Sequence, residues 1–246
     1  MPLISTFMRL SACLLALLGC LNSAHAALTL SNSRIVHESD KNSSSVTVGN
    51  PSKKTYAAQA WVNTEADDTT TAVPLMASPA LFRIAPGDEQ SVQINRLPND
   101  LPQDRESLFF FNLQEIPQAD TDSDRNALNI AMRTRIKLFY RPSQLKGKPQ
   151  AHLKDLKWSV QRIDGKQHLV VDNPSPFYFT FNQLEVSGNG HTEKLKGREM
   201  VRPFGQQTYA LTSTKALANL SVTFTTLSDY GGVTPAVTQP LPTATP

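Results

Sequence analysis

Hydrophobic and polar residues alternate along several stretches of the chain, and one stretch is much longer than the rest. From Leu128 to Tyr140 every second residue is Leu, Ile, Met, Thr, Ile, Leu or Tyr, and the residues between them include Arg133, Arg135 and Lys137. A period of two predicts a β-strand with one apolar face. The alternation continues for about fourteen residues, whereas an average strand has about five or six. The sequence therefore predicts one very long strand, apolar on one side and cationic on the other.

Shorter alternating stretches precede this strand, and turn residues separate them. Asn50-Pro51 and Pro86-Gly87-Asp88 stand between such stretches, as Gly, Pro, Asn and Asp do in turns. Strands are expected at Ala27–Leu30, Ser44–Gly49, Ala57–Asn63, Leu81–Ile84, Gln90–Ile94 and Leu108–Glu115. Short, regularly spaced strands with few helix signals predict a sandwich of the immunoglobulin type.

The same pattern restarts after a polar segment, residues 143–150, which we interpret as a linker. Strands are expected at Leu156–Arg162, Gln167–Asp172, Tyr178–Val186, Thr192–Leu195, Gln207–Ala210 and Leu220–Leu227. Asp164-Gly165 lies between the first two of these, and Asp-Gly between alternating runs is a strong hairpin signal. The sequence therefore predicts an all-β protein with two sandwich domains, at 27–142 and 151–231.

The two ends of the chain are expected to lie outside these domains. An apolar run from Leu10 to Leu21, followed by Ala24-His25-Ala26, predicts a secretory signal peptide over residues 1–26 that export removes. Leu17-Leu18-Gly19-Cys20 leaves an alternative open, because it resembles a bacterial lipoprotein box that would leave the cysteine lipidated. Residues 232–246 carry no charge and several prolines, so we expect a disordered tail.

The expected mature chain carries little that points to catalysis. Both cysteines, Cys13 and Cys20, lie in the expected signal peptide, so no disulfide is expected. The histidines show no metal-ligand spacing, and there is no nucleophile elbow, phosphate loop or dinucleotide fingerprint. The formal net charge of +3 does not indicate nucleic-acid binding. We therefore expect no enzyme, no cofactor or metal, and no small-molecule substrate.

Several short motifs carry a resemblance to a known family. They are Asn50-Pro51, Pro79-Ala80-Leu81-Phe82-Arg83, Leu101-Pro102-Gln103-Asp104-Arg105-Glu106-Ser107-Leu108-Phe109, Asn112, Ile116-Pro117, Thr134-Arg135-Ile136-Lys137-Leu138-Phe139-Tyr140-Arg141-Pro142 and Ser228-Asp229-Tyr230-Gly231. Each motif alone is a weak signal, but all of them in this order and at this spacing are highly specific. With these residues the chain resembles the PapD-like periplasmic chaperones of the chaperone–usher pathway, over nearly all of the expected mature chain.

The resemblance implies both an architecture and a function. The family has two immunoglobulin-like domains set as an L or boomerang, with a cleft between them. Its members cap incomplete pilin (fimbrial) subunits in the periplasm by lending them a long strand, which is a form of β-augmentation, and deliver them to an outer-membrane usher. Leu128, Ile130 and Met132 match the donor segment of that strand. The segment Gln118–Asn126 is short and lacks cysteine, as in the short-loop subfamily, and a self-capping homodimer is a further partner to consider.

The resemblance also implies roles for individual charges. An Arg and a Lys of the family grip the C-terminal carboxylate of the subunit, and these positions align with Arg34 and Lys137. Two cations on one carboxylate give charge-assisted hydrogen bonds that would fix the register of the bound strand. Lys137 has the opposite parity to Leu128, Ile130 and Met132, so a twist or a bulge must reorient the strand between them.

Three further charges, Glu106, Arg141 and Asp229, match an interdomain ion-pair set of the family. We interpret Arg133 and Arg135 as a solvated cationic face. The alternative function is a fimbrial structural subunit or adhesin with immunoglobulin-like domains. We disfavour it because of the basic anchor pair, the two-domain layout and the short segment between the expected signal peptide and the first strand.

Overall fold

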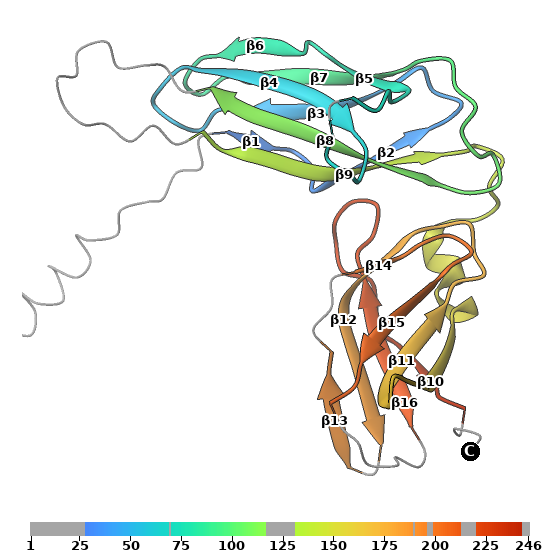
Figure 1. The fold of residues 1–246 in the computed structure, drawn as a ribbon. Helices are drawn as coiled ribbons and strands as arrows, with labels where there is room; N and C mark the ends of the chain where they lie inside the picture. The colour runs from blue at the N-terminus through green and yellow to red at the C-terminus, as the bar shows by residue number, and fades with distance from the viewer. Residues whose placement is uncertain are drawn as a thin grey trace, which may run out of the picture.

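The computed structural model describes residues 28–68, 70–116, 131–188, 190–195, 199–212 and 220–242. These residues form two β-sandwiches that meet at one end of each and lie at a steep angle to one another, as Figure 1 shows. The prediction of an all-β protein with two immunoglobulin-like domains in an L arrangement is confirmed. The expected signal peptide, with Cys13 and Cys20, lies outside the described residues. No helix within the described ranges is long and apolar enough to cross a membrane.

The first domain packs two sheets against each other, one antiparallel and one mixed. Its strands are β1 (Thr29–Leu30), β2 (Arg34–Glu38), β3 (Ser43–Gly49), β4 (Tyr56–Asn63), β5 (Leu75–Ser78), β6 (Leu81–Ile84), β7 (Glu89–Arg96), β8 (Ser107–Ile116) and β9 (Arg133–Arg141). One sheet has the order β1-β3-β7-β5 and the other the order β2-β9-β8-β4-β6, in which β2 and β9 are parallel. Apolar residues at every second position of the strands point between the two sheets and form the core. Examples that are almost completely buried are Val46, Val92 and Ile94 in one sheet and Phe111 and Leu138 in the other.

The second domain is smaller and has its own core. Its elements are the 3₁₀ helix η1 (Pro149–Asp155) and the strands β10 (Lys157–Ile163), β11 (Lys166–Asp172), β12 (Phe179–Gly188), β13 (His191–Lys194), β14 (Met200–Val201), β15 (Gln206–Ala210), β16 (Ser221–Thr226) and β17 (Val237–Pro240). One sheet has the order β10-β11-β15, and the other has the order β13-β12-β16-β17 with β14 also on β12. Trp158, Phe181 and Phe224 form the aromatic centre of this core, with ring centroids 5.2–5.6 Å apart.

The described part of the long strand is shorter than the alternation predicts. Strand β9 has nine residues, and Ala131 and Met132 precede it without strand assignment. Pairing with β8 nevertheless continues one step further, because the Glu115 N–H donates to the Met132 carbonyl at 2.9 Å. Leu128 and Ile130, and the Gln118–Asn126 segment, lie outside the described residues.

The expectation of a disordered tail is wrong for the described part of residues 232–246. Strand β17 pairs with β16, and Leu241 is buried in the second core. The composition argument failed because a four-residue strand needs little hydrophobic sequence when a neighbouring strand supplies its hydrogen bonds.

The polar linker, residues 143–150, is partly structured, since Leu145 packs against the second core and Pro149 begins η1.

Candidate functional site at the domain junction

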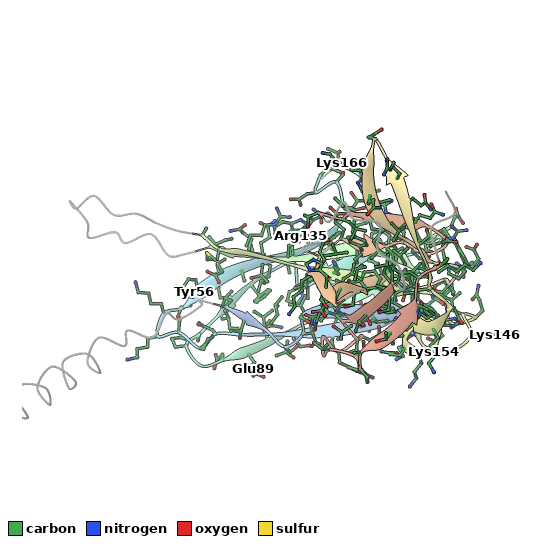
Figure 2. All side chains as sticks on the ribbon, turned by 90° about the horizontal axis from the view of Figure 1, so that it is seen from below. Tyr56, Glu89, Arg135, Lys146, Lys154 and Lys166 are labelled. Atoms are coloured by element: carbon green, nitrogen blue, oxygen red, sulfur yellow. The ribbon has the colours of Figure 1, made fainter. Side chains whose placement is uncertain are left out.

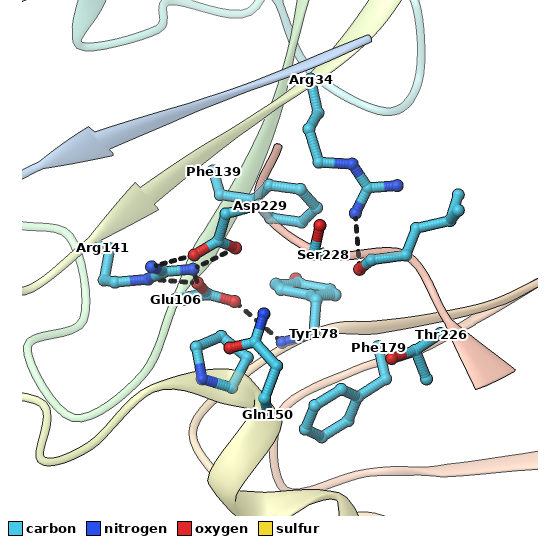
Figure 3. Close-up of a pocket in the computed structure, with 12 residues that line it drawn as sticks. Arg34, Glu106, Phe139, Arg141, Gln150, Tyr178, Phe179, Thr226, Ser228 and Asp229 are labelled. Atoms are coloured by element: carbon cyan, nitrogen blue, oxygen red, sulfur yellow. Dashed lines mark hydrogen bonds and ion pairs between the residues drawn. The ribbon is translucent and has the colours of Figure 1, made fainter. Parts of the chain in front are cut away.

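Two cations lie side by side where the first domain meets the second. Arg34 begins β2, and parallel pairing with β9 places it directly opposite Lys137. Arg34 is buried, with 7% of its surface exposed, and its Nη1 donates to the Leu227 carbonyl of the second domain at 3.3 Å. Among the described residues no acceptor lies within hydrogen-bonding distance of its Nε. Figure 3 shows the guanidinium reaching toward the second domain.

Lys137 also reaches across the junction. Its Nζ donates to Thr180 Oγ1 at 3.3 Å. Burial and the neighbouring Arg34 lower the pKa of Lys137 to about 8, and Glu65 opposes this shift. Burial also lowers the pKa of Arg34, although Asp229 and Glu106 raise it. Both shifts have the sign expected for cations that are removed from water without a close counter-ion.

This arrangement favours binding of an anion. Within the described part of the chain, neither Arg34 nor Lys137 has a carboxylate within ion-pair distance. A carboxylate placed between two such cations would receive charge-assisted hydrogen bonds and relieve their mutual repulsion. The pair therefore has the chemistry of a carboxylate site.

A second group of charges links the two domains beside the cation pair. Arg141 Nε donates to Glu106 Oε1 at 2.7 Å, and its Nη1 and Nη2 donate to the two carboxylate oxygens of Asp229 at 2.8 and 2.9 Å. Arg141 and Glu106 belong to the first domain and Asp229 to the second, so this bidentate pair bridges the junction (Figure 3). The structure thus brings together the three charges that the resemblance singled out.

Glu106 is a satisfied buried carboxylate. Its second oxygen accepts the Tyr178 N–H at 2.8 Å, and its own N–H donates to the Pro176 carbonyl at 3.0 Å. Burial raises the pKa of Glu106, and Arg141 opposes that shift. Burial lowers the pKa of Arg141, but hydrogen bonds and charges from Asp229 and Glu106 outweigh it and raise that pKa. A small pocket lies between this network and Arg34.

Arg133 is exposed and Arg135 is half-buried, as a partly solvated face would be, but each guanidinium also has specific partners that we did not expect. The Arg133 guanidinium lies 4.9 Å from the Trp61 ring centre and pairs with Asp67. That of Arg135 lies 3.8 Å from the Phe110 ring centre, and its Nη2 donates to a main-chain carbonyl of the loop after β4 at 2.7 Å. Figure 2 labels Arg135 on the first domain, in a view in which the two domains partly overlap. Both residues hold the loop after β4, and their partners are too far away in sequence for the alternation to reveal them.

One donor residue is described. Met132 is 56% exposed and lies immediately before β9. Beyond it, β9 pairs with β2 only from Lys137 onward, and no other described strand pairs with the outer edge of Arg133–Ile136. The first half of β9 therefore presents an open edge that ends at the cation pair.

Sequence reasoning missed several residues of the junction. Thr180 binds Lys137, and Arg202 Nη2 donates to Glu65 Oε2 at 2.7 Å in a second, exposed interdomain pair. No sequence signal marks them, because each pair joins residues of different domains. Among the described residues, no group of three or more His, Cys, Asp or Glu is placed to hold a metal ion.

Comparison with known proteins identifies relatives over both domains. The family described as "Pili and flagellar-assembly chaperone, PapD N-terminal domain" matches residues 27–146, and "Pili assembly chaperone PapD, C-terminal domain" matches residues 151–238. The probable fimbrial chaperone YadV of Escherichia coli K12 is 33% identical over 230 residues, which are 89% of this chain and 92% of that protein. The chaperone protein PapD of Escherichia coli is 33% identical over 216 residues, which are 86% of each chain. The crystal structure of the YadV chaperone has a TM-score of 0.76 and 30% identity, covering 88% of this chain and all of that one.

Proposed function

This chain belongs to the PapD family of pilus-assembly chaperones, and from that premise we propose that it binds pilin subunits by donor-strand complementation. The subunit's last strand would pair with the open edge of β9, and its C-terminal carboxylate would bind Arg34 and Lys137. The observation that supports this most directly is the position of the two cations at the point where the open edge ends.

The donor segment would supply the apolar part of the interaction. Leu128, Ile130 and Met132 would enter the open groove of the subunit, and each buried side chain would contribute about 1.5–3 kcal/mol. Methionine is flexible and polarisable, which suits a protein that binds several related subunits. Exposed apolar edges promote aggregation, so such an edge is retained where a partner covers it.

The interdomain charges would have a positioning role. The Glu106–Arg141–Asp229 network would hold the angle between the domains and with it the position of the cation pair relative to the second domain. We further propose that the chain is exported to the periplasm and cleaved after Ala26, that it transfers subunits to an outer-membrane usher, that a self-capping homodimer forms without subunits, and that it has no enzymatic activity.

Co-expression with a candidate pilin tests the proposed function. We expect a soluble one-to-one complex that protects the pilin from proteolysis, and loss of that protection in Lys137→Ala and Arg34→Ala variants that fold normally. Loss of one partner from a desolvated charge pair weakens binding by about 2–5 kcal/mol. Amidation of the pilin C-terminus should have the same effect, and either variant should add little to it. Full additivity would mean that the cations do not bind the carboxylate. Polymerisation of this chain into fibres would instead favour the structural-subunit alternative.

A further inference from the structure

A buried carboxylate lies at the end of β8, far from the domain junction. Glu115 is only 5% exposed, and its Oε1 accepts the Leu28 N–H at 2.9 Å. Within the described residues it has no ion-pair partner. Burial raises the pKa of Glu115, and main-chain hydrogen bonds from Leu28 and Met132 oppose the shift. Burying an ionised carboxylate without a nearby cation costs free energy, so a cation bound to Glu115 would stabilise the folded protein.

Among the described residues, the strands that pair with β8 and the N-terminal side do not supply that cation. The facing strand β4 places Ala57, Ala58 and Gln59 around it, which are uncharged. On β9 the first cation is Arg133, whose guanidinium is already bound to Asn112 and Asp67. The N-terminal side contributes the main-chain N–H of Leu28 alone.

The missing cation can come from the chain itself. We propose that Glu115 is the binding site for the α-ammonium group that cleavage after Ala26 creates on Ala27. Hydrolysis of the Ala26–Ala27 peptide bond leaves a carboxylate on the released peptide and an amine on Ala27, which is mostly protonated at pH 7 because its ordinary pKa is about 7.7–8.0. Only two backbone atoms separate this amine from the Leu28 nitrogen, so the two nitrogens lie about 3–4 Å apart. Both can therefore reach one carboxylate.

The ion pair would join the first residue of the mature chain to the strand that leads to the donor segment. Glu115 also donates its main-chain N–H to the Met132 carbonyl, so the N-terminus and the start of β9 share one anchor. An unprocessed or extended chain has an uncharged amide at the same place. The favourable charge pair therefore forms only after processing, and the proposal rests on cleavage after Ala26.

The sign of the pH dependence distinguishes the two forms. In an extended chain the pKa of Glu115 is raised on folding, so stability falls as pH rises from about 4.3, its unfolded pKa, through the raised folded value. In the mature chain the ammonium lowers the pKa of Glu115 and removes this loss. The ammonium's own pKa rises in the pair, so the advantage is complete between about pH 4.3 and 7.7. It disappears at higher pH as the ammonium loses its proton, and at lower pH as Glu115 gains one.

Four exported proteins test the proposal. They are the chain beginning at Ala27 and the chain carrying two extra residues before Ala27, each with Glu115 or with Glu115→Gln. In the mature chain we expect Glu115→Gln to lower Tm by a few degrees at pH 6.5. In the extended chain the same substitution should leave Tm unchanged or raise it. Glu89→Gln is the matched control. Glu89 pairs with Gly49, which pairs with Thr29, so Glu89 lies in the same sheet as the N-terminal strand, but its side chain is exposed. This substitution should change the Tm of neither form.

A second measurement uses the unaltered mature protein. The pH dependence of acetylation of its α-amine should give a pKa at least about one above the ordinary range, and Glu115→Gln should return it to that range. The same Tm change in mature and extended chains, or an ordinary amine pKa with Glu115 present, would overturn the proposal. So would an N-terminal sequence that begins anywhere other than Ala27. The pilin-binding function does not depend on this outcome.

Discussion

Replacement of Lys137 by methionine is expected to stabilise the free protein while it abolishes binding of a subunit's C-terminus. Burial and the neighbouring Arg34 lower the pKa of Lys137 from its ordinary value of 10.5 to about 8. A tenfold change in a protonation equilibrium corresponds to about 1.4 kcal/mol, so holding this ammonium charged in the folded protein at pH 7 costs up to roughly 3 kcal/mol.

The expected gain is smaller than this upper limit. Lys137 is partly exposed, so solvent screens some of its charge, and the substitution removes its hydrogen bond to Thr180. Such a bond contributes about 0.5–1.5 kcal/mol. Methionine keeps an unbranched side chain that fills a similar volume. We therefore expect the free energy of unfolding to rise by about 1–2 kcal/mol at pH 7.

Urea denaturation at several pH values measures this effect. Because the folded pKa of Lys137 lies below its unfolded value, the wild-type protein carries the full penalty below about pH 8 and loses it as pH rises toward 10.5. The advantage of Lys137→Met should therefore shrink over that range, whereas Lys137→Arg keeps the charge and should give no gain. A less stable methionine variant at pH 7, or a gain that does not change with pH, would refute the reasoning.

Three further predictions concern the junction and the donor segment. Arg141→Leu leaves the buried Glu106 without its cation and should destabilise the protein by about 3–5 kcal/mol in urea denaturation, whereas a loss below 1 kcal/mol would contradict this. Arg202→Gln breaks only the exposed pair with Glu65 and should change stability by less than about 1 kcal/mol, and thermal melts should show this small change shrinking at high salt, where the pair is screened. Met132→Ser should leave Tm within a few degrees and reduce protection of a bound pilin, and a large drop in Tm would instead place Met132 in the protein's own core.

Local patterns predicted the sandwiches because the relevant information is local. The hairpin between β10 and β11 shows this best: Asp164 and Gly165 have φ of 49° and 75°, the left-handed conformation that a two-residue turn between twisted strands requires. Ile136 and Leu138, which the alternation puts on the apolar side of the long strand, pack in the first core. Strands β2, β5, β14 and β17 were not predicted from the sequence. Each has only two to five residues, too few to show a clear alternation, and each is a strand because it forms hydrogen bonds with a neighbouring strand.

The candidate site could be anticipated only in part. The sequence alone does not place Arg34 beside Lys137, because parallel pairing of β2 with β9 joins residues 103 positions apart, and their choice as a pair came from the family resemblance. Nor does it indicate that Arg135 is held by an aromatic ring and a loop carbonyl, or that Glu115 is buried. The burial and the partners of these charged residues are set by tertiary contacts. The sequence pattern shows only that the residues are polar, which by itself predicts a place on the surface.

Strand β9 explains why one short segment can serve both stability and binding. Its even-numbered residues Ile136 and Leu138 pack in the first core, while Lys137 and Arg141 on the opposite face meet the second domain. Arg141 has two close carboxylates and Lys137 has none within ion-pair distance among the described residues. The same face thus holds one charge that is satisfied within the free protein and one that is not. The proposed function needs this asymmetry, because a junction whose charges were all paired would hold the domains together but would give a subunit's carboxylate no unpaired cation to bind.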